Sequence, residues 1–182
     1  MEIRILASGS KGNCYMIDDG HTKLLIEAGI SFKAIQKALD FKVSEVKGCL
    51  ISHEHKDHSK AAEDLMWAGI DVIASEGTIL SLGLSGICLI RPLKEVSIGS
   101  WTITPFPVEH DAAEPLGFLL RSGSEKLLYL TDTPYSRYRF SGLTARRGES
   151  IRTPSAYDLL HLPIEDSTLS DDLRQTAAHL TL

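Results

Sequence analysis

The sequence predicts an α/β protein in which a mixed β-sheet is covered by helices. Three observations lead to this fold class. Strand and helix patterns alternate in the first half of the chain, a succession of strand patterns follows, and a cluster of histidines and aspartates comes directly after a buried strand. With 182 residues, 43% of them hydrophobic, the chain is long enough for one domain with a substantial core.

The first elements are short. EIRILA (2–7) reads as a strand that ends in the glycine- and serine-rich turn SGSKGN, and two further strands flank the hairpin signal Asp19-Gly20. Ser31 is a plausible N-cap for the helix that follows. Apolar residues at helical spacing occur there at Phe32, Ile35, Ala38 and Leu39. GCLIS (48–52) is a continuous apolar run, as expected of a strand buried on both faces.

The middle of the chain continues this alternation. SKAAEDLMWAG (59–69) predicts one helix that ends at Gly69, DVIAS (71–75) predicts a strand, and GTILSLGL (77–84) a short helix. A run of strands then follows, at 87–93, 94–100, 101–110, 116–123 and 126–132. Residues 142–156 show no clear period, and residues 167–182 again have helical spacing.

Composition limits the partners and the cellular location that we expect for the protein. The net charge of −5 argues against a surface that coats nucleic acid. No apolar run approaches the roughly 20 residues of a membrane helix, and the first residues lack the pattern of a signal peptide, so we expect a cytoplasmic protein without a membrane partner. Cys14, Cys49 and Cys88 are too few for a disulfide framework, and we expect them to be small buried residues.

The heptapeptide SHEHKDH (52–58) contains a cluster of candidate metal ligands. His53 and His55 are two residues apart on an extended segment, so their side chains point the same way and can converge on one metal ion. Asp57 and His58 continue the series at the start of a helix, where they can hold a second ion. Imidazoles and a carboxylate suit Zn²⁺, and also Mn²⁺ or iron.

The spacing H-x-H-x-D-H resembles the signature of the metallo-β-lactamase fold. LASGSKGNCYMI (6–17) and LLIEAG (24–29) make the chain similar to the small bacterial and phage exonuclease-like branch of that fold, from Met1 to about Leu143. The resemblance implies an αββα sandwich with a shortened second half. Residues 1–143 would form its core, and residues 144–182 a divergent segment packed on, or trailing from, the same domain.

The resemblance also implies a ligand set. His53, His55 and His110 would hold the first ion, Asp57 and His58 the second, and Asp132 would bridge the two. The last ligand expected is a histidine on the second ion, for which His161 is the best candidate and His179 the next. Glu27 stands where the family usually has an aspartate that braces the metal loop.

Two zinc ions in such a site would activate a bridging hydroxide, with Asp57, His58 and Asp132 as the catalytic residues. The resemblance, the turn that contains Ser8, Ser10, Lys11 and Asn13, and the basic, aromatic stretch that contains Tyr135, Arg137 and Tyr138 favour a phosphodiesterase, specifically an exonuclease with DNA as its substrate. The five arginines between 137 and 152 are typical either of a solvated loop or of a phosphate-binding rim.

Two alternatives stay open. A protein of this fold can hydrolyse a small ester or thioester at the same ions, because fold alone does not select the substrate. The altered C-terminal segment can also have left an inactive metal-binding remnant with an incomplete second site. The oligomeric state is not predicted.

Overall fold

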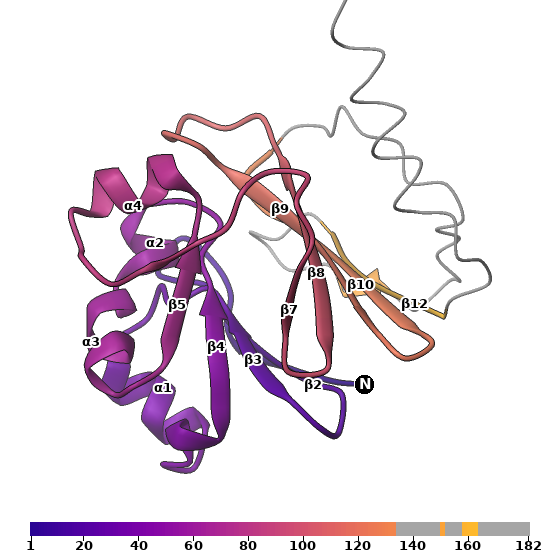
Figure 1. Cartoon of the computed structure of the whole chain (residues 1–182). Helices are drawn as coiled ribbons and strands as arrows, with labels where there is room; N and C mark the ends of the chain where they lie inside the picture. The colour runs from indigo at the N-terminus through magenta and orange to yellow at the C-terminus, as the bar shows by residue number, and fades with distance from the viewer. Residues whose placement is uncertain (134–149, 152–157, 164–182) are drawn as a thin grey trace, which may run out of the picture.

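The computed structural model describes residues 1–133, 150–151 and 158–163. Within these residues two six-stranded sheets pack face to face, and short helices cover the outer face of the first sheet (Figure 1). The predicted α/β class and its metallo-β-lactamase-like arrangement are confirmed. Most of the segment 144–182, including the helix expected at 167–182 and His179, lies outside the described residues.

The first sheet has the strand order β1-β2-β3-β4-β5-β6. Its strands are β1 (Glu2–Ala7), β2 (Cys14–Asp18), β3 (Lys23–Ile26), β4 (Val46–Leu50), β5 (Asp71–Ala74) and β6 (Cys88–Leu89). The first three strands are antiparallel, and β3 to β6 are parallel. The hairpin predicted around Asp19-Gly20 joins β2 to β3.

Four α-helices and one 3₁₀ helix accompany this sheet. They are α1 (Phe32–Ala38), η1 (Val43–Glu45), α2 (Lys56–Ser59), α3 (Ala62–Trp67) and α4 (Glu76–Leu82). Ser31 caps α1 as predicted, since its side chain accepts a hydrogen bond from the Ala34 N–H. Ile35, Leu65 and neighbouring apolar side chains pack against the sheet in one buried cluster.

The helix predicted at 59–69 is two helices in the structure. Helix α2 begins earlier, at Lys56, and the chain breaks before α3 begins at Ala62. The reason is tertiary, because the Ala61 N–H donates to the carbonyl of Ala28, beyond the end of β3, over 2.8 Å. The break leaves Asp57 and His58 on a short helix whose carbonyls accept hydrogen bonds from Asn13, just before β2, and Ala28, just after β3.

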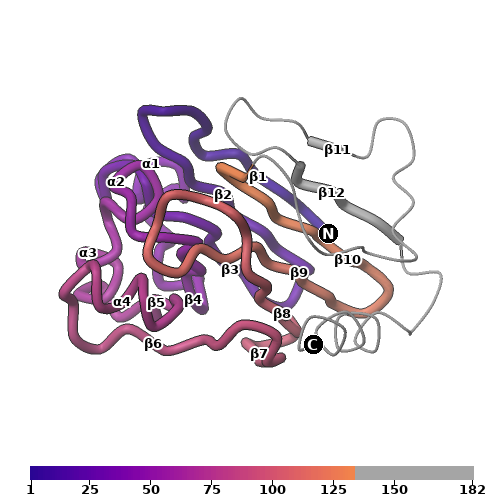
Figure 2. The backbone as a smooth tube through the Cα atoms, turned by 90° about the horizontal axis from the view of Figure 1, so that it is seen from above, coloured from indigo at the N-terminus to yellow at the C-terminus, as the bar shows by residue number. Residues whose placement is uncertain are grey.

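The second sheet has the order β11-β12-β10-β9-β8-β7, with every neighbouring pair antiparallel. Its strands are β7 (Val96–Ile98), β8 (Trp101–Pro107), β9 (Leu116–Ser122), β10 (Glu125–Leu130), β11 (Ser150–Ile151) and β12 (Asp158–Pro163). In the view from above, the helices lie on one side of the first sheet and β8 to β10 on the other (Figure 2). No helix of the described residues covers the outer face of the second sheet.

The space between the sheets is filled by large apolar side chains. Tyr15, Trp101, Phe118 and Tyr129 are all fully buried in this cluster. Removing that much apolar surface from water, at about 25 cal/mol per Å², is the main force that holds the two sheets together. The strand ends that precede the candidate ligands are therefore held by a well-packed core.

Three further observations complete the comparison with the predictions. Cys14 and Cys49 are buried as expected, but Cys88 is exposed, because its strand β6 is a two-residue edge strand and not the longer one predicted at 87–93. His21 is exposed in its turn. Among the described residues, no helix is long and apolar enough to cross a membrane.

Candidate metal centre

The predicted ligands gather at one edge of the two sheets. His53 and His55 lie in the loop between β4 and α2, and Asp57 and His58 lie in α2. The segment after β8 brings His110 to the same place, and the end of β10 brings Asp132. These positions follow the C-terminal ends of their strands, where α/β proteins commonly form their sites.

Three histidines form the first group. The ligand atoms of His53, His55 and His110 all lie within 4.8 Å of one another. The Nε2 atom of His110 is 3.3 Å from Nδ1 of His55, and the three rings have centroids 4.6–5.1 Å apart. Three imidazole nitrogens directed at a common point are the donor set of a transition-metal site.

The second group consists of His53, His58 and Asp132, again within 4.8 Å. Oδ2 of Asp132 is 2.8 Å from Nε2 of His58 and 3.8 Å from Nε2 of His53. A carboxylate oxygen of Asp57 lies 3.6 Å from the same His58 nitrogen. Because His53 belongs to both groups, two cation positions would be adjacent.

The loop that carries His110 is fastened to the loop that carries His53. The Leu116 N–H donates to the carbonyl of Ser52 over 3.0 Å, and the Ala113 N–H donates to Oε1 of Glu54 over 2.8 Å. Each sheet contributes one of these loops, so the histidine group depends on the packing of the sheets.

Glu27 is a buried carboxylate that contacts the residues of the candidate centre from the protein interior. It is fully buried, its backbone has φ +67°, and its carboxylate accepts hydrogen bonds from the Ser52 N–H (3.3 Å) and the Tyr129 hydroxyl (3.1 Å). Its Oε1 is 3.4 Å from Nδ1 of His58. Glu27 therefore holds the ring of His58 with Nε2 directed toward Asp132, which is how a carboxylate orients a metal-binding histidine.

Two further polar side chains orient the rings. The Ser52 hydroxyl is 2.9 Å from Nδ1 of His53, and the amide of Asn13 is 3.2 Å from Nε2 of His58. Asn13 is fully buried. Its side chain lies against α2, and the structure does not present it on the surface of the turn where Ser10 and Lys11 lie. Sequence reasoning missed Ser52 altogether, although it adjoins His53.

Burial and charge set the protonation of His53 and His58, the two histidines of the second group. Burial, with the neighbouring His58, lowers the pKa of His53 to about 2, so this ring is neutral at physiological pH and can donate a lone pair. Burial also opposes charge on His58, but the carboxylate of Glu27 and then that of Asp132 outweigh it and raise the pKa of His58 to about 10. The second position thus strongly favours a positive charge.

The residues present fit a metal ion. Nε2 of His53 is buried at the middle of the cluster and has no hydrogen-bond partner. An unpaired buried polar atom is costly unless something binds it, and a metal ion at the point shared by these rings would do so. Imidazole nitrogens and aspartate oxygens are suited to Zn²⁺, Mn²⁺ or iron.

His161 is not brought together with the other predicted ligands. Its backbone lies in β12 opposite Leu127 of β10, and Asp132 follows Leu127 by five residues. Asp132 lies beyond the end of β10 at Leu130, and the three residues from Leu127 to Leu130 alone span about 10 Å at the rise of an extended strand. Tyr135, Arg137, Tyr138 and the rest of the predicted basic, aromatic stretch lie outside the described residues.

The other predicted substrate-binding residues lie in the turn after β1. Ser10 and Lys11 are exposed there, and both line a hollow that also contains Asp57. Ser8 is half-buried in the same turn. The structure thus brings Ser10 and Lys11 next to the candidate centre, in contrast to Asn13.

The fold and this cluster of histidines and carboxylates define a domain of the metallo-β-lactamase type. The chain belongs to the β-lactamase superfamily, because the family model described as "Beta-lactamase superfamily domain" matches residues 22–150.

Among characterised proteins, the chain is 28% identical over 159 residues to the exodeoxyribonuclease YycJ of Bacillus anthracis, covering 79% of this chain and 58% of that protein. It is 32% identical over 152 residues to the exodeoxyribonuclease WalJ of Streptococcus pneumoniae, covering 76% and 56%. The chain thus spans less than two thirds of the length of these relatives.

Solved structures support the fold. The metallo-β-lactamase fold protein YhfI from Bacillus subtilis superposes with a TM-score of 0.61 at 17% identity, covering 78% of this chain and 64% of that one. The class B3 di-zinc metallo-β-lactamase LRA-12, from an Alaskan soil metagenome, superposes with a TM-score of 0.53 at 18% identity, covering 70% and 61%.

Proposed function

We propose that the chain is a metal-dependent phosphodiesterase that degrades DNA and uses two metal ions. Zn²⁺ is the ion we expect, and Mn²⁺ or iron are the alternatives. The observation that carries the proposal is the pair of overlapping ligand groups that share His53. His53, His55 and His110 would hold one ion, and His58 with Asp57 the other. Asp132, close to both His53 and His58, would lie between them.

Bound metal ions would supply a hydroxide nucleophile at neutral pH and would offset the negative charge that builds up on a phosphate during hydrolysis. Side chains of the protein would orient the metal ligands and accept a proton. Glu27 and Ser52 orient the rings of His58 and His53, and the half-exposed Asp57 is placed to accept a proton at its carboxylate. His161 is left out of this ligand set because its strand register separates it from Asp132.

The choice of DNA as substrate is supported by the similarity to the two bacterial exodeoxyribonucleases. Ser10 and Lys11, exposed beside Asp57, are suitable contacts for a phosphate group. Both observations point to a phosphodiester rather than to an uncharged ester.

The test uses purified protein loaded with Zn²⁺ or Mn²⁺ and end-labelled linear DNA. His53→Ala and Asp132→Ala are each expected to reduce DNA degradation by about 100-fold or more, because each removes a ligand and outer partners alone are typically worth 10–100-fold. His21→Ala, which removes an exposed histidine in the β2–β3 turn, is the matched control and should keep full activity.

Each contrary result has a distinct meaning. Equal DNA degradation by His53→Ala would refute the metal assignment. Cleavage of a generic carboxylic ester or thioester without cleavage of DNA would show the small-molecule hydrolase. One ion per chain by elemental analysis, together with no turnover of either substrate, would show the inactive remnant.

A further inference from the structure

A hollow of about 700 Å³ opens directly beside the candidate metal centre, with Asp57 in its wall. Its lining comes from four parts of the chain: the turn after β1, Gly29 after β3, the segment from Glu54 through α2 to Glu63, and the end of α4 with Leu84. Three lysines contribute to it, Lys11, Lys56 and Lys60. We call this hollow the lysine groove.

Folding brings these lysines together. The Asn13 N–H donates to the carbonyl of Asp57 over 2.7 Å, which fastens the turn that contains Lys11 to helix α2. Lys56 and Lys60 are four residues apart, so they lie on one side of the helical turn. All three are exposed, and among the described residues no acidic side chain forms an ion pair with them. Their charges are available to a ligand.

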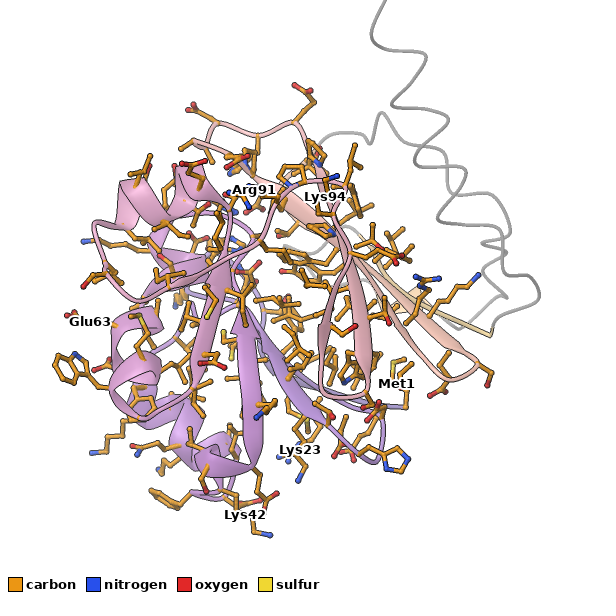
Figure 3. All side chains as sticks on the ribbon, in the orientation of Figure 1. Met1, Lys23, Lys42, Glu63, Arg91 and Lys94 are labelled. Atoms are coloured by element: carbon orange, nitrogen blue, oxygen red, sulfur yellow. The ribbon has the colours of Figure 1, made fainter. Side chains whose placement is uncertain are left out.

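A second hollow, of about 410 Å³, continues from the first. Glu63 and Leu84 line both, and the second hollow also contains Trp67, whose side chain is 81% exposed. Glu63 lies on the helical side of the molecule (Figure 3). The path from Asp57 to Trp67 therefore runs over α2 and α3, away from the second sheet.

We propose that the lysine groove and the Trp67 hollow form one track for an unpaired segment of the DNA strand that is cleaved at the metal centre, an inference that rests on the proposed function. The track combines two features of single-strand binding sites, exposed lysines beside the backbone and an aromatic ring for the bases. Lys11, Lys56 and Lys60 contact phosphates, and the indole of Trp67 stacks on a base.

The groove is continuous with the candidate metal centre, which favours a DNA strand over a protein as the molecule that binds there. The groove begins at Asp57, a proposed ligand, so a strand bound at the metals enters it without leaving the surface. Three acidic residues also line the first hollow: Asp57 is a proposed ligand, and Glu54 accepts a hydrogen bond from the Ala113 N–H. The negative charge of Glu63 lies where the two hollows meet and repels a phosphate. The track is thus expected to bind DNA more tightly when that charge is removed.

Tryptophan fluorescence tests the stacking directly. The chain has two tryptophans, of which Trp101 is fully buried and Trp67 is exposed. A phosphorothioate-linked oligothymidylate of about ten nucleotides, which resists cleavage, should quench the emission of the metal-loaded protein. In Trp67→Phe, where Trp101 alone emits, the quenching should disappear. Trp67→Ala should weaken binding by between about 5- and 100-fold. Phe41→Ala, at another highly exposed aromatic residue, is the matched control.

Salt dependence tests the lysines. Each phosphate contact with a single strand contributes about 0.7 to the slope of log affinity against log salt, so Lys56→Ala/Lys60→Ala should reduce that slope by about 1.4. The matched control is Lys33→Ala/Lys37→Ala, an exposed pair at the same spacing on α1, which should leave the slope unchanged. Glu63→Gln should bind the oligonucleotide more tightly than the unaltered protein.

Kinetics separate this inference from the proposed function. The groove variants should lose kcat/KM on DNA but keep it on bis(p-nitrophenyl) phosphate, which is too small to reach Trp67. If the unaltered protein cleaves neither, the proposed function fails. If it cleaves DNA and the groove variants match it in quenching, salt slope and rate, the track is refuted while the phosphodiesterase stands. If Trp67→Ala instead abolishes self-association in sedimentation and leaves DNA binding intact, the surface joins two copies of the chain and the track is refuted.

Discussion

Replacing Glu27 by glutamine removes one negative charge from beneath the candidate centre and leaves the shape of the side chain. Glu27 has no exposed surface, and its carboxylate contacts the Ser52 N–H, the Tyr129 hydroxyl and Nδ1 of His58. The substitution therefore tests whether the charge of this residue, and not only its volume, prepares His58 to bind a cation.

The expected effect follows from these contacts. The carboxylate lies 3.4 Å from Nδ1 of His58, and Nε2 of the same ring faces Asp132, where it would bind the second ion once its proton is displaced. Loss of such a partner typically weakens metal binding by 10–100-fold, which corresponds to about 1.4–2.7 kcal/mol. Glu27 contacts His58, a proposed ligand of the second ion, so that ion should be lost first.

The measurement is the zinc affinity from competition with a chromophoric chelator, together with ions per chain by elemental analysis. Glu45→Gln is the matched control, because Glu45 is an exposed glutamate whose partner is Lys23 at the surface. If Glu27→Gln binds both ions with the affinity of the unaltered protein, the orienting role of Glu27 is refuted. If Glu45→Gln weakens binding equally, the effect of Glu27 is not specific to the centre.

Two further perturbations concern the support of the site and the link between the sheets. Gly29→Ala should abolish metal binding or folding, as judged by elemental analysis and circular dichroism, because a Cβ there would lie 1.7 Å from the carbonyl oxygen of Asp57. Asp19→Asn should lower the free energy of unfolding at neutral pH by about 1 kcal/mol. Although burial opposes it, hydrogen bonds from Ser100 and Ser122 hold the pKa of Asp19 well below its usual range. The folded pKa is lower than the unfolded value of about 3.9, so this stability is present above pH 4 and is lost as the pH falls further. Urea unfolding of both proteins should therefore give a difference at pH 7 that shrinks below pH 4, and a difference that is constant with pH would contradict the assignment.

Much of the fold could be predicted because its signals are local. The run GCLIS forms a buried parallel strand, Ser31 caps a helix, and Asp19-Gly20 closes a hairpin. Each of these depends on residues within a few positions of one another. The cluster His53–His58 is local in the same sense, which is why the donor types and their position after a strand were visible.

The support of the centre could not be predicted, because its contacts join distant parts of the chain. Tyr129 reaches Glu27 across 102 residues, and Asn13 reaches His58 across 45. The break between α2 and α3 has the same origin, since it depends on a hydrogen bond from Ala61 to Ala28. No periodicity within a short window reports such contacts.

The sequence by itself determined most of the order of strands and helices up to β10, apart from the break between α2 and α3, and the chemistry of the donors, because periodicity and side-chain type are properties of the chain. Only the tertiary structure decided which donors meet. The packing of two sheets brings His110 and Asp132 to His53, and the register of β12 on β10 keeps His161 away. Both depend on the burial of apolar side chains from strands far apart in sequence, and this packing sets the positions of the strand ends.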